Sequence, residues 1–293
     1  MPESDVTPRE LIDAGQRTTV DGMDVFWVSA GDPRERHPVV FLHGIPTWCW
    51  LWRNVMLETG AVTRSIAVDL PGFGMSEYSA EQDFRIATLA ETVEQFLDQV
   101  VGAGARVTLV VHDFGALVGA ELIARAPGRY SGLILTNTSL RAGAWSGGGP
   151  LLVLSVPWLG QLSMLLARPW MLRMAMRPFV TDPEARSGNR FAGYWYPFEH
   201  GFGQSLARFY QQRPVEPGDF DRWRTALAEY TGRCLILWGG RDPAFTVSEV
   251  NDLLSLLPDA ETMIFDNASH FLPEEHPRAV GRRIRTFLER EAD

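Results

Sequence analysis

An aspartate stands where an apolar run of the chain changes into a glycine-rich one. Residues 107–111 read as a buried strand, and His112, Asp113, Phe114 and Gly115 follow it directly. A sharp strand-to-helix turn would hold its central side chain clear of the backbone, and a glycine two residues later permits such a turn. A serine in this position performs acyl transfer, whereas a carboxylate can attack a saturated carbon and leave an enzyme ester. The pattern therefore predicts Asp113 as a nucleophile directed at an sp3 carbon.

Two further side chains follow in the order that such a nucleophile requires. Residues 233–241 read as a buried strand and turn that present Asp242, and the short apolar run 263–265 precedes His270. Nucleophile, acid and histidine in this chain order can form a triad at the ends of parallel strands. His270 would activate a water molecule as a base, while Asp242 would orient the imidazole and stabilise its positive charge. We therefore expect these two residues and Asp113 to form and then hydrolyse a covalent ester.

Backbone donors for the negative charge of that hydrolysis are expected from two turns. The apolar run 39–42 is followed by a His-Gly-x-Pro sequence in which x is Ile45. Phe114 lies at the start of the helix expected after Asp113, where free N–H groups point toward an anion. Together, the amides of Ile45 and Phe114 would form an oxyanion hole.

The elements that must position these residues alternate between strand and helix. Strand character is found at residues 22–30, 39–42, 65–69, 107–111 and 132–137, with helices expected at 86–101 and 277–289. This alternation predicts the α/β class, a mostly parallel sheet flanked by helices. Ligands of such sheets bind at the carboxyl ends of the strands, which is where Asp113 and Asp242 are expected.

The segment between the two halves of this pattern has a different character. Residues 151–179 are rich in Leu, Met and Trp at helical spacing, and a proline and a glycine interrupt the run too early for a membrane-spanning helix. We therefore expect a helical cap at residues 141–219, inserted between a first core part, 1–140, and a second, 220–293. The methionines of this segment suit either an adaptable apolar pocket or a surface that contacts a membrane or a second copy.

These motifs together resemble those of the haloalkane dehalogenases and, next, of the epoxide hydrolases, both in the α/β-hydrolase superfamily. The resemblance extends from about residue 20 to the C-terminus and also rests on residues 46–48, 51–54, 136–138, 194–198 and 267–272. It implies an α/β-hydrolase fold with an inserted cap, an enzyme that needs no cofactor, and the triad roles given above. Asn137 occupies the position at which another branch of the family carries its acid, which favours Asp242 as the acid here.

Two positions depart from the dehalogenase pattern. That family has a tryptophan after the nucleophile, whose indole N–H holds the departing halide, whereas Phe114 has no donor. Ile45 likewise replaces the asparagine that commonly supplies a second halide contact. A hydrogen bond to a charged group contributes about 1.5–3 kcal/mol, so the loss of two could slow halide departure about 10²- to 10⁴-fold. Substrate contacts are expected instead from other aromatic residues, namely Trp48, Trp170, Tyr194 and Tyr196.

Cleavage of a carbon–halogen bond is narrowly favoured, and three other functions remain open. An epoxide hydrolase would need a proton for the leaving oxygen, and Tyr194, Tyr196 and Tyr210 lie in the expected cap. Opening of a lactone-like or other strained ring would use the same nucleophile. A receptor that binds a small ligand without turning it over belongs to another class, and the complete triad disfavours it.

Composition and charge set the remaining expectations. The chain has 293 residues, a formal net charge of −9 and two cysteines, Cys49 and Cys234. The acidic balance argues against nucleic acid or an anionic membrane as the main partner, and two apolar-flanked cysteines in a long chain indicate reduced thiols. The N-terminus has no signal pattern, and no His/Cys cluster has metal-ligand spacing. We expect a cytoplasmic monomer or homodimer that acts on a small apolar substrate and water, without a metal, a cofactor or a transmembrane segment.

Overall fold

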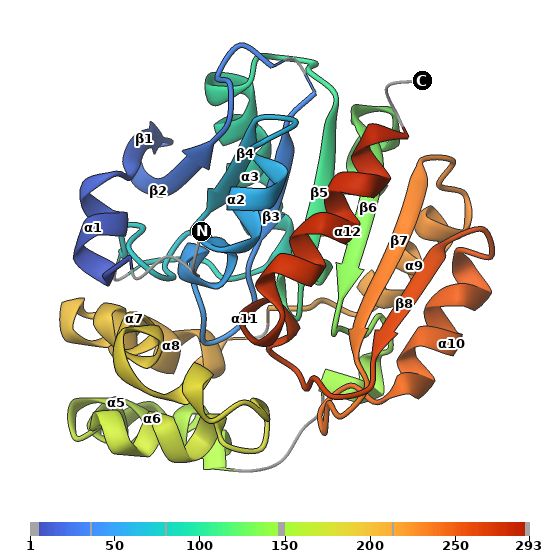
Figure 1. Ribbon diagram of the computed structural model, residues 1–293. Helices are drawn as coiled ribbons and strands as arrows, with labels where there is room; N and C mark the ends of the chain where they lie inside the picture. The colour runs from blue at the N-terminus through green and yellow to red at the C-terminus, as the bar shows by residue number, and fades with distance from the viewer. Residues whose placement is uncertain (1–5, 36, 80, 146–149, 213, 291–293) are drawn as a thin grey trace.

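One sheet organises the molecule. The computed structural model describes residues 6–35, 37–79, 81–145, 150–212 and 214–290, and the strand order within them is β1-β2-β4-β3-β5-β6-β7-β8 (Figure 1). The strands are β1 (Gln16–Val20), β2 (Met23–Ala30), β3 (Val39–Leu42), β4 (Ser65–Val68), β5 (Val107–His112), β6 (Tyr130–Thr136), β7 (Arg233–Gly239) and β8 (Glu261–Phe265). Neighbouring strands from β4 to β8 are parallel, whereas β2 is antiparallel to both β1 and β4. The prediction of a mostly parallel sheet is therefore confirmed.

The central strands are buried on both faces of the sheet. Along β3, Val39 and Phe41 pack into the core on one face, while Val40 and Leu42 pack into the core on the other. Because successive side chains of a strand point to opposite faces, a strand covered on both sides must be apolar throughout.

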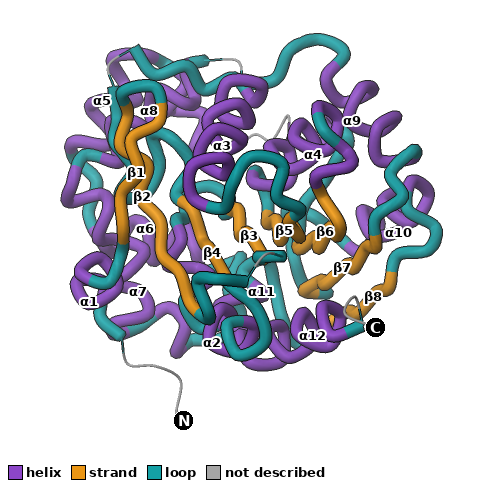
Figure 2. Tube along the Cα trace, turned by 90° about the horizontal axis from the view of Figure 1, so that it is seen from above, coloured by secondary structure: helices purple, strands orange, loops and turns teal. Residues whose placement is uncertain are grey.

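Helices form a layer on each face (Figure 2). One layer holds α3 (Ile86–Val100), α4 (Gly115–Arg125), α9 (Asp219–Ala228) and α10 (Val247–Leu256), and the other holds α2 (Val55–Thr59) and α12 (Pro277–Glu289). Two short helices complete the core, α1 (Pro8–Asp13) before β1 and α11 (Leu272–Glu275) before α12. The sheet is thus enclosed, and its strand ends are the place left for a site.

A helical insertion separates β6 from α9. Its longer helices are α5 (Pro157–Leu165), α6 (Pro169–Met176), α7 (Gly188–Trp195) and α8 (Phe202–Gln211). The insertion lies beyond the end of the sheet to which β5 and β6 point, with α7 and α8 nearer the sheet and α5 and α6 outermost (Figure 1). No helix in the described ranges is long and apolar enough to cross a membrane. Residues 1–5, on which the expectation about a signal pattern rests, lie outside those ranges.

Of the strands, β1 is the one that the sequence pattern does not predict. Its residues are mostly polar and exposed, because it lies at the edge of the sheet. Val20 pairs with Met23 across the two-residue turn Asp21-Gly22, in which φ is 48° and 81°. Asp-Gly is a favoured pair for such a tight hairpin turn, and the turn moves the start of β2 from residue 22 to Met23. The other predicted strands and both predicted helices end within two residues of the observed limits.

Candidate active site

Asp113 occupies the turn between β5 and α4. Its φ is 51°, in the left-handed region that non-glycine residues rarely adopt. A Cβ on Gly115 would lie 2.6 Å from the carbonyl oxygens of Leu42 and His43, and a Cβ on Gly44 would collide with the Asp113 side chain. The two glycines therefore allow the loop after β3 to approach the turn closely enough to contact the Asp113 carboxylate.

The loops after β7 and β8 bring Asp242 and His270 to the same place. His270 Nδ1 lies 2.8 Å from Asp242 Oδ2, and His270 Nε2 lies 3.7 Å from Asp113 Oδ2. All three residues are buried, with 6% exposure for Asp113 and less for the other two. The shorter distance is that of a hydrogen bond, whereas the longer one is beyond hydrogen-bond range, so the imidazole and the Asp113 carboxylate face each other without a direct hydrogen bond. The three residues that the sequence predicts as a triad are therefore adjacent in the fold.

Asp242 is the more heavily hydrogen-bonded of the two carboxylates. Its Oδ1 accepts the N–H groups of Ala244 and Phe245 at 2.7 and 3.1 Å. Its Oδ2 accepts a hydrogen bond from Asn137 Nδ2 at 2.8 Å, in addition to the contact with His270. Burial alone would raise the pKa of Asp242, but the His270 charge and these hydrogen bonds outweigh burial and lower that pKa. Asp242 therefore remains charged beside the imidazole.

Asp113 accepts fewer hydrogen bonds. Its Oδ1 accepts the N–H of Ile45 at 2.8 Å, and the backbone N–H of Phe114 also favours the charged carboxylate. Burial nevertheless raises the pKa of Asp113, against the lowering effect of the His270 charge. The amides of Ile45 and Phe114, which the sequence predicts as oxyanion donors, thus both act on this side chain.

Three buried histidines lie near these groups, and their pKa values are shifted in different directions. Burial lowers the pKa of His270, but the Asp242 charge and hydrogen bond outweigh burial, so that the pKa is raised. The His112 ring centroid lies 4.7 Å from that of His270, and burial, followed by the His270 charge, lowers the pKa of His112. Burial lowers the pKa of His43 to about 4, and its Nε2 accepts the N–H of Leu70 at 3.0 Å. Of the three, His270 is the histidine whose ring nitrogen faces the Asp113 carboxylate, at 3.7 Å.

Aromatic side chains surround the triad, and most of them belong to no recognisable sequence motif. The ring centroid of Phe209, on α8, lies 5.0 Å from that of Phe114. The centroids of Phe245 and Phe179 lie 5.7 and 5.8 Å from that of His270. These residues come from separate segments with no shared spacing, so no pattern in the sequence groups them. The wall they form is apolar and suits an apolar substrate.

The tyrosines of the insertion occupy different surroundings. Burial raises the pKa of Tyr210, and the Asp113 charge raises it further, so Tyr210 lies within electrostatic range of that carboxylate. The Tyr194 hydroxyl instead donates to Glu274 Oε2 at 2.7 Å, and the Tyr196 ring stacks on a histidine of the insertion. Neither tyrosine has a ring contact or hydrogen bond with the triad within the described part of the chain, and the expectation that they contact substrate stays a prediction.

The tryptophans provide no indole pair for a halide. Trp48 donates its N–H to the carbonyl of Gly193 at 2.8 Å, and Trp170 is 66% exposed. The substrate contacts expected of these two residues stay predictions. Six further indoles donate to other protein acceptors: Trp27, Trp50, Trp145, Trp195, Trp223 and Trp238. Trp158 is exposed, and the unpartnered N–H of Trp52 belongs to a ring that packs against Phe41. Seven indoles of the described residues thus donate to acceptors of the protein itself.

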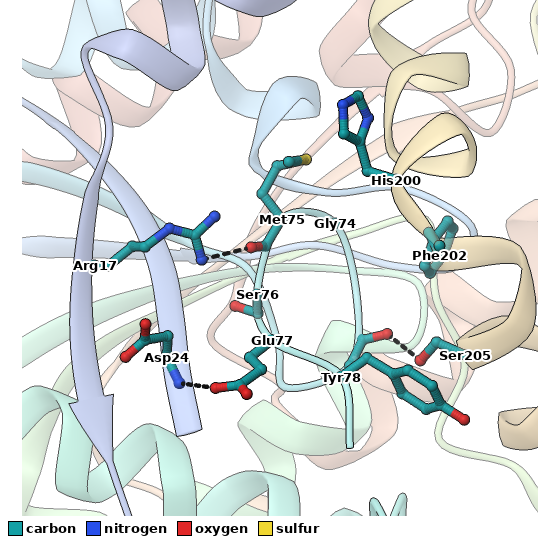
Figure 3. Close-up of a pocket in the computed structure, with 12 residues that line it drawn as sticks. Arg17, Asp24, Gly74, Met75, Ser76, Glu77, Tyr78, His200, Phe202 and Ser205 are labelled. Atoms are coloured by element: carbon teal, nitrogen blue, oxygen red, sulfur yellow. Dashed lines mark hydrogen bonds between the residues drawn. The ribbon is translucent and has the colours of Figure 1, made fainter. Parts of the chain in front are cut away.

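A separate pocket of about 400 Å³ lies between the first hairpin, the loop at residues 72–78 and the start of α8 (Figure 3). No triad residue lines it. Arg17, one of its charged residues, donates from Nη1 to the carbonyl of Met75 at 2.9 Å. We therefore place the candidate chemistry at Asp113 rather than in this pocket. Across the described ranges, no group of three or more His, Cys, Asp or Glu residues could hold a metal ion.

Comparisons with known proteins identify the family of the chain. Residues 39–283 match the alpha/beta hydrolase family. A cis-3-alkyl-4-alkyloxetan-2-one decarboxylase of Xanthomonas campestris is 28% identical over 290 residues, which cover 88% of this chain and 90% of that protein. A haloalkane dehalogenase of Mycolicibacterium paratuberculosis is 28% identical over 264 residues, covering 86% of this chain and 83% of that protein.

The fold has solved counterparts as well. The crystal structure of a haloalkane dehalogenase from Bradyrhizobium elkani aligns with a TM-score of 0.78 at 23% identity, covering 94% of this chain and 97% of the other. This likeness confirms the predicted α/β-hydrolase fold. Because the family match includes the loops that carry Asp113, Asp242 and His270, the chain is an enzyme of the α/β hydrolase family.

Proposed function

We propose that this enzyme is a hydrolase that forms an ester between Asp113 and a saturated carbon of its substrate. The arrangement around Asp113 carries the proposal, because Oδ1 is 2.8 Å from the Ile45 nitrogen and Oδ2 is 3.7 Å from His270 Nε2. Asp242 accepts hydrogen bonds from both sides and is therefore suited to orient His270 rather than to attack. Two carboxylates in such different surroundings fit two different roles.

The reaction has two steps. In the first, a lone pair of Asp113 forms the ester C–O bond while the bond from that carbon to its leaving group breaks. In the second, His270 takes a proton from water, whose oxygen attacks the carboxyl carbon of the ester. The amides of Ile45 and Phe114 would stabilise the resulting oxyanion, and its collapse releases an alcohol that takes up the proton from His270. Asp242 stabilises the imidazolium in between.

The intact mass of variants tests the ester. His270→Gln should form the ester and then stall, because glutamine cannot take a proton from water, so the protein mass rises by that of the bound group. The matched control is the double variant Asp113→Ala/His270→Gln, which should remain unmodified. Full turnover by His270→Gln, or a mass increase in the double variant, would contradict these roles.

In this proposal, the helical insertion acts as a cap over Asp113. Phe209, on α8, contacts Phe114, and Tyr210 lies within electrostatic range of Asp113. We therefore propose residues 141–219 as a roof that excludes bulk water from the ester, over a core formed by residues 1–140 and 220–293.

As substrate we propose an apolar molecule with a strained oxygen ring, such as an epoxide or a four-membered lactone. A halide leaves as a free ion and needs N–H donors, but Phe114 and Ile45 have no side-chain donor. The oxygen of an opened ring stays attached to the substrate, and a lactone releases a carboxylate that needs no proton. Similarity to the oxetan-2-one decarboxylase supports the lactone, while the protonated Tyr210 near Asp113 would suit an epoxide.

Cleavage of a carbon–halogen bond is the second candidate. It is favoured by the similarity to a haloalkane dehalogenase over 86% of this chain. The nucleophile, base and acid would be the same residues, and the difference would lie in how the leaving group is stabilised.

Three probes of matched chain length distinguish these substrates in the His270→Gln variant: a terminal epoxide, a cis-3,4-dialkyl β-lactone and a 1-bromoalkane. A ring adds its whole mass to the protein, whereas the bromide adds its mass less HBr. Products of the lactone are also collected, because the ester with its free β-carboxylate can lose CO2, forming an alkene and returning Asp113 as carboxylate. Reaction with the rings alone supports the first candidate, and an adduct from the bromide alone would assign the second.

A further inference from the structure

The outer helices of the insertion expose a concentration of large apolar side chains. Twelve large apolar residues are exposed in the described part of the chain, and eight of them form the α5–α6 surface: Val156, Trp158, Leu162, Leu165, Leu166, Trp170, Met171 and Met174. Trp158 and Leu165 are each 69% exposed, and Trp170 is 66% exposed. Monomeric proteins rarely expose large apolar patches, and such patches mark interaction sites.

The exposed side chains lie on the helix faces that the core does not use. In α5, Trp158, Leu162 and Leu165 recur at a spacing that places them on one face, while Gly160 is buried against Leu154. In α6, Met176 is the buried residue. Figure 1 shows α5 and α6 as the outermost elements at this end of the molecule, so their outer faces have no other element over them.

Charge is distributed unevenly around this surface. The chain carries a net charge of −9, yet residues 142–181 contain no Asp or Glu. Arg168, Arg173 and Arg177 lie in this segment, and all three are exposed. Arg173 rests over the Phe191 ring at 4.5 Å, and within the described ranges none of the three arginines forms an ion pair. An acidic protein therefore presents a local surface that is apolar and cationic.

We propose that the α5–α6 surface docks onto an anionic phospholipid bilayer. Tryptophan favours the boundary between headgroups and acyl chains, leucine and methionine can enter that boundary, and arginines bind anionic headgroups. A second copy of the chain fits this surface less well, because a symmetric interface would bring the same arginines against one another. Docking here would also turn the roof over Asp113 toward a source of apolar substrates, but the proposal does not depend on the chemistry at Asp113.

Vesicle partitioning of the full chain tests the charge. We expect binding to phosphatidylcholine vesicles that contain phosphatidylglycerol, weaker binding to pure phosphatidylcholine, and loss of the difference in high salt. Arg168→Gln/Arg177→Gln should lower partitioning onto the anionic vesicles about tenfold to thirtyfold. The control Arg9→Gln/Arg282→Gln makes the same change in net charge at two exposed positions elsewhere and should bind as the unmodified chain does.

A second pair of variants tests the apolar contact. Trp158→Ser/Trp170→Ser should weaken binding to both kinds of vesicle, whereas Leu57→Ser/Met263→Ser, at positions 52% and 40% exposed, should not. Circular dichroism melting of each variant shows that it is folded. The proposal is overturned by an unmodified chain that fails to bind anionic vesicles at low salt, by equal losses in test and control pairs, or by a concentration-dependent dimer that the tryptophan variant abolishes.

Discussion

Two carboxylates flank His270, and each approaches a different nitrogen of its ring. Asp242 is held through both oxygens by protein donors, and the His270 charge together with these hydrogen bonds lowers its pKa despite burial. Asp113 has a raised pKa because burial dominates over its fewer donors. At the scale of single residues, the two carboxylates therefore differ in their surroundings. Asp242 is fixed and charged beside the imidazole, whereas Asp113 has fewer hydrogen bonds to lose when it forms a bond to substrate.

The raised pKa of His270 predicts how ester hydrolysis depends on pH. Only the neutral imidazole can accept a proton, so hydrolysis should fall as pH drops through the His270 pKa, with a midpoint above the ordinary value of about 6.5. Asp242→Asn should move that midpoint to lower pH, because the Asp242 charge is the main group that raises this pKa. The profile of kcat against pH measures both, and a midpoint that does not move would contradict the electrostatic role of Asp242.

Asn137 offers a second test of the same pair. Asn137 Nδ2 donates to the Asp242 oxygen that also contacts His270, so its side chain lies beside the imidazole. Asp242→Asn should lower kcat about 10³- to 10⁴-fold. The exchange Asp242→Asn/Asn137→Asp returns a negative charge to that place and should recover at least about tenfold of the loss. Asn137→Asp alone is the control, and an exchange no better than Asp242→Asn would show that the position of the charge is decisive.

At the scale of elements, one buried carboxylate joins the insertion to the loop that carries His270. Glu274, on α11, accepts from Arg53 Nη1 and Nη2 at 2.6 and 2.9 Å. From α7, Arg190 Nε and the Tyr194 hydroxyl also donate to it, each at 2.7 Å. Because α11 follows His270 directly, this network fixes the insertion relative to the triad.

Stability should respond to this network in a graded way. Glu274→Gln breaks a buried ion pair and should lower the free energy of unfolding by about 3–5 kcal/mol. Tyr194→Phe removes one hydrogen bond to a charged group and should cost about 1.5–3 kcal/mol. Tyr196→Phe is the matched control and should change little. Guanidinium unfolding measures all three, and equal values for the two tyrosine variants would exclude Tyr194 from the network.

At the scale of the whole molecule, both cysteines are free and buried, Cys49 at the start of a short 3-10 helix (Cys49–Trp52) and Cys234 on β7. Burial and then the Asp69 charge raise the pKa of Cys49, and burial raises the pKa of Cys234 to about 12. Neither thiol is therefore a thiolate at neutral pH, and reaction with either reports on opening of the fold.

Thiol labelling should follow global unfolding. At pH 8 the native protein should react very slowly with Ellman's reagent, because the thiolate is the reactive form and is scarce at both sites. In denaturant, both thiols should react quickly. Single variants Cys49→Ala and Cys234→Ala assign each rate, and rapid labelling of either site in native protein would contradict its burial.

The sequence by itself determined the alternation of strands and helices and the order of Asp113, Asp242 and His270. These features are local, because a buried parallel strand must be apolar throughout and a strand-to-helix turn needs small residues beside it. The edge strand β1 was not predicted because only one of its five residues is buried. Its sequence therefore lacks the alternation of apolar and polar residues that indicates a strand. The α/β-hydrolase fold is confirmed, whereas the roles of the triad residues stay predictions.

Only the tertiary structure decided what surrounds those residues. Phe179, Phe209 and Phe245 reach the site from segments far apart in the chain, and their convergence depends on packing that no spacing encodes. The Tyr194 hydroxyl donates to Glu274, 80 residues away in sequence, and no spacing in the sequence indicates this partner. Hydrogen-bond partners and exposed helix faces depend on which side each helix turns toward the core, and that orientation is set by contacts between distant parts of the chain.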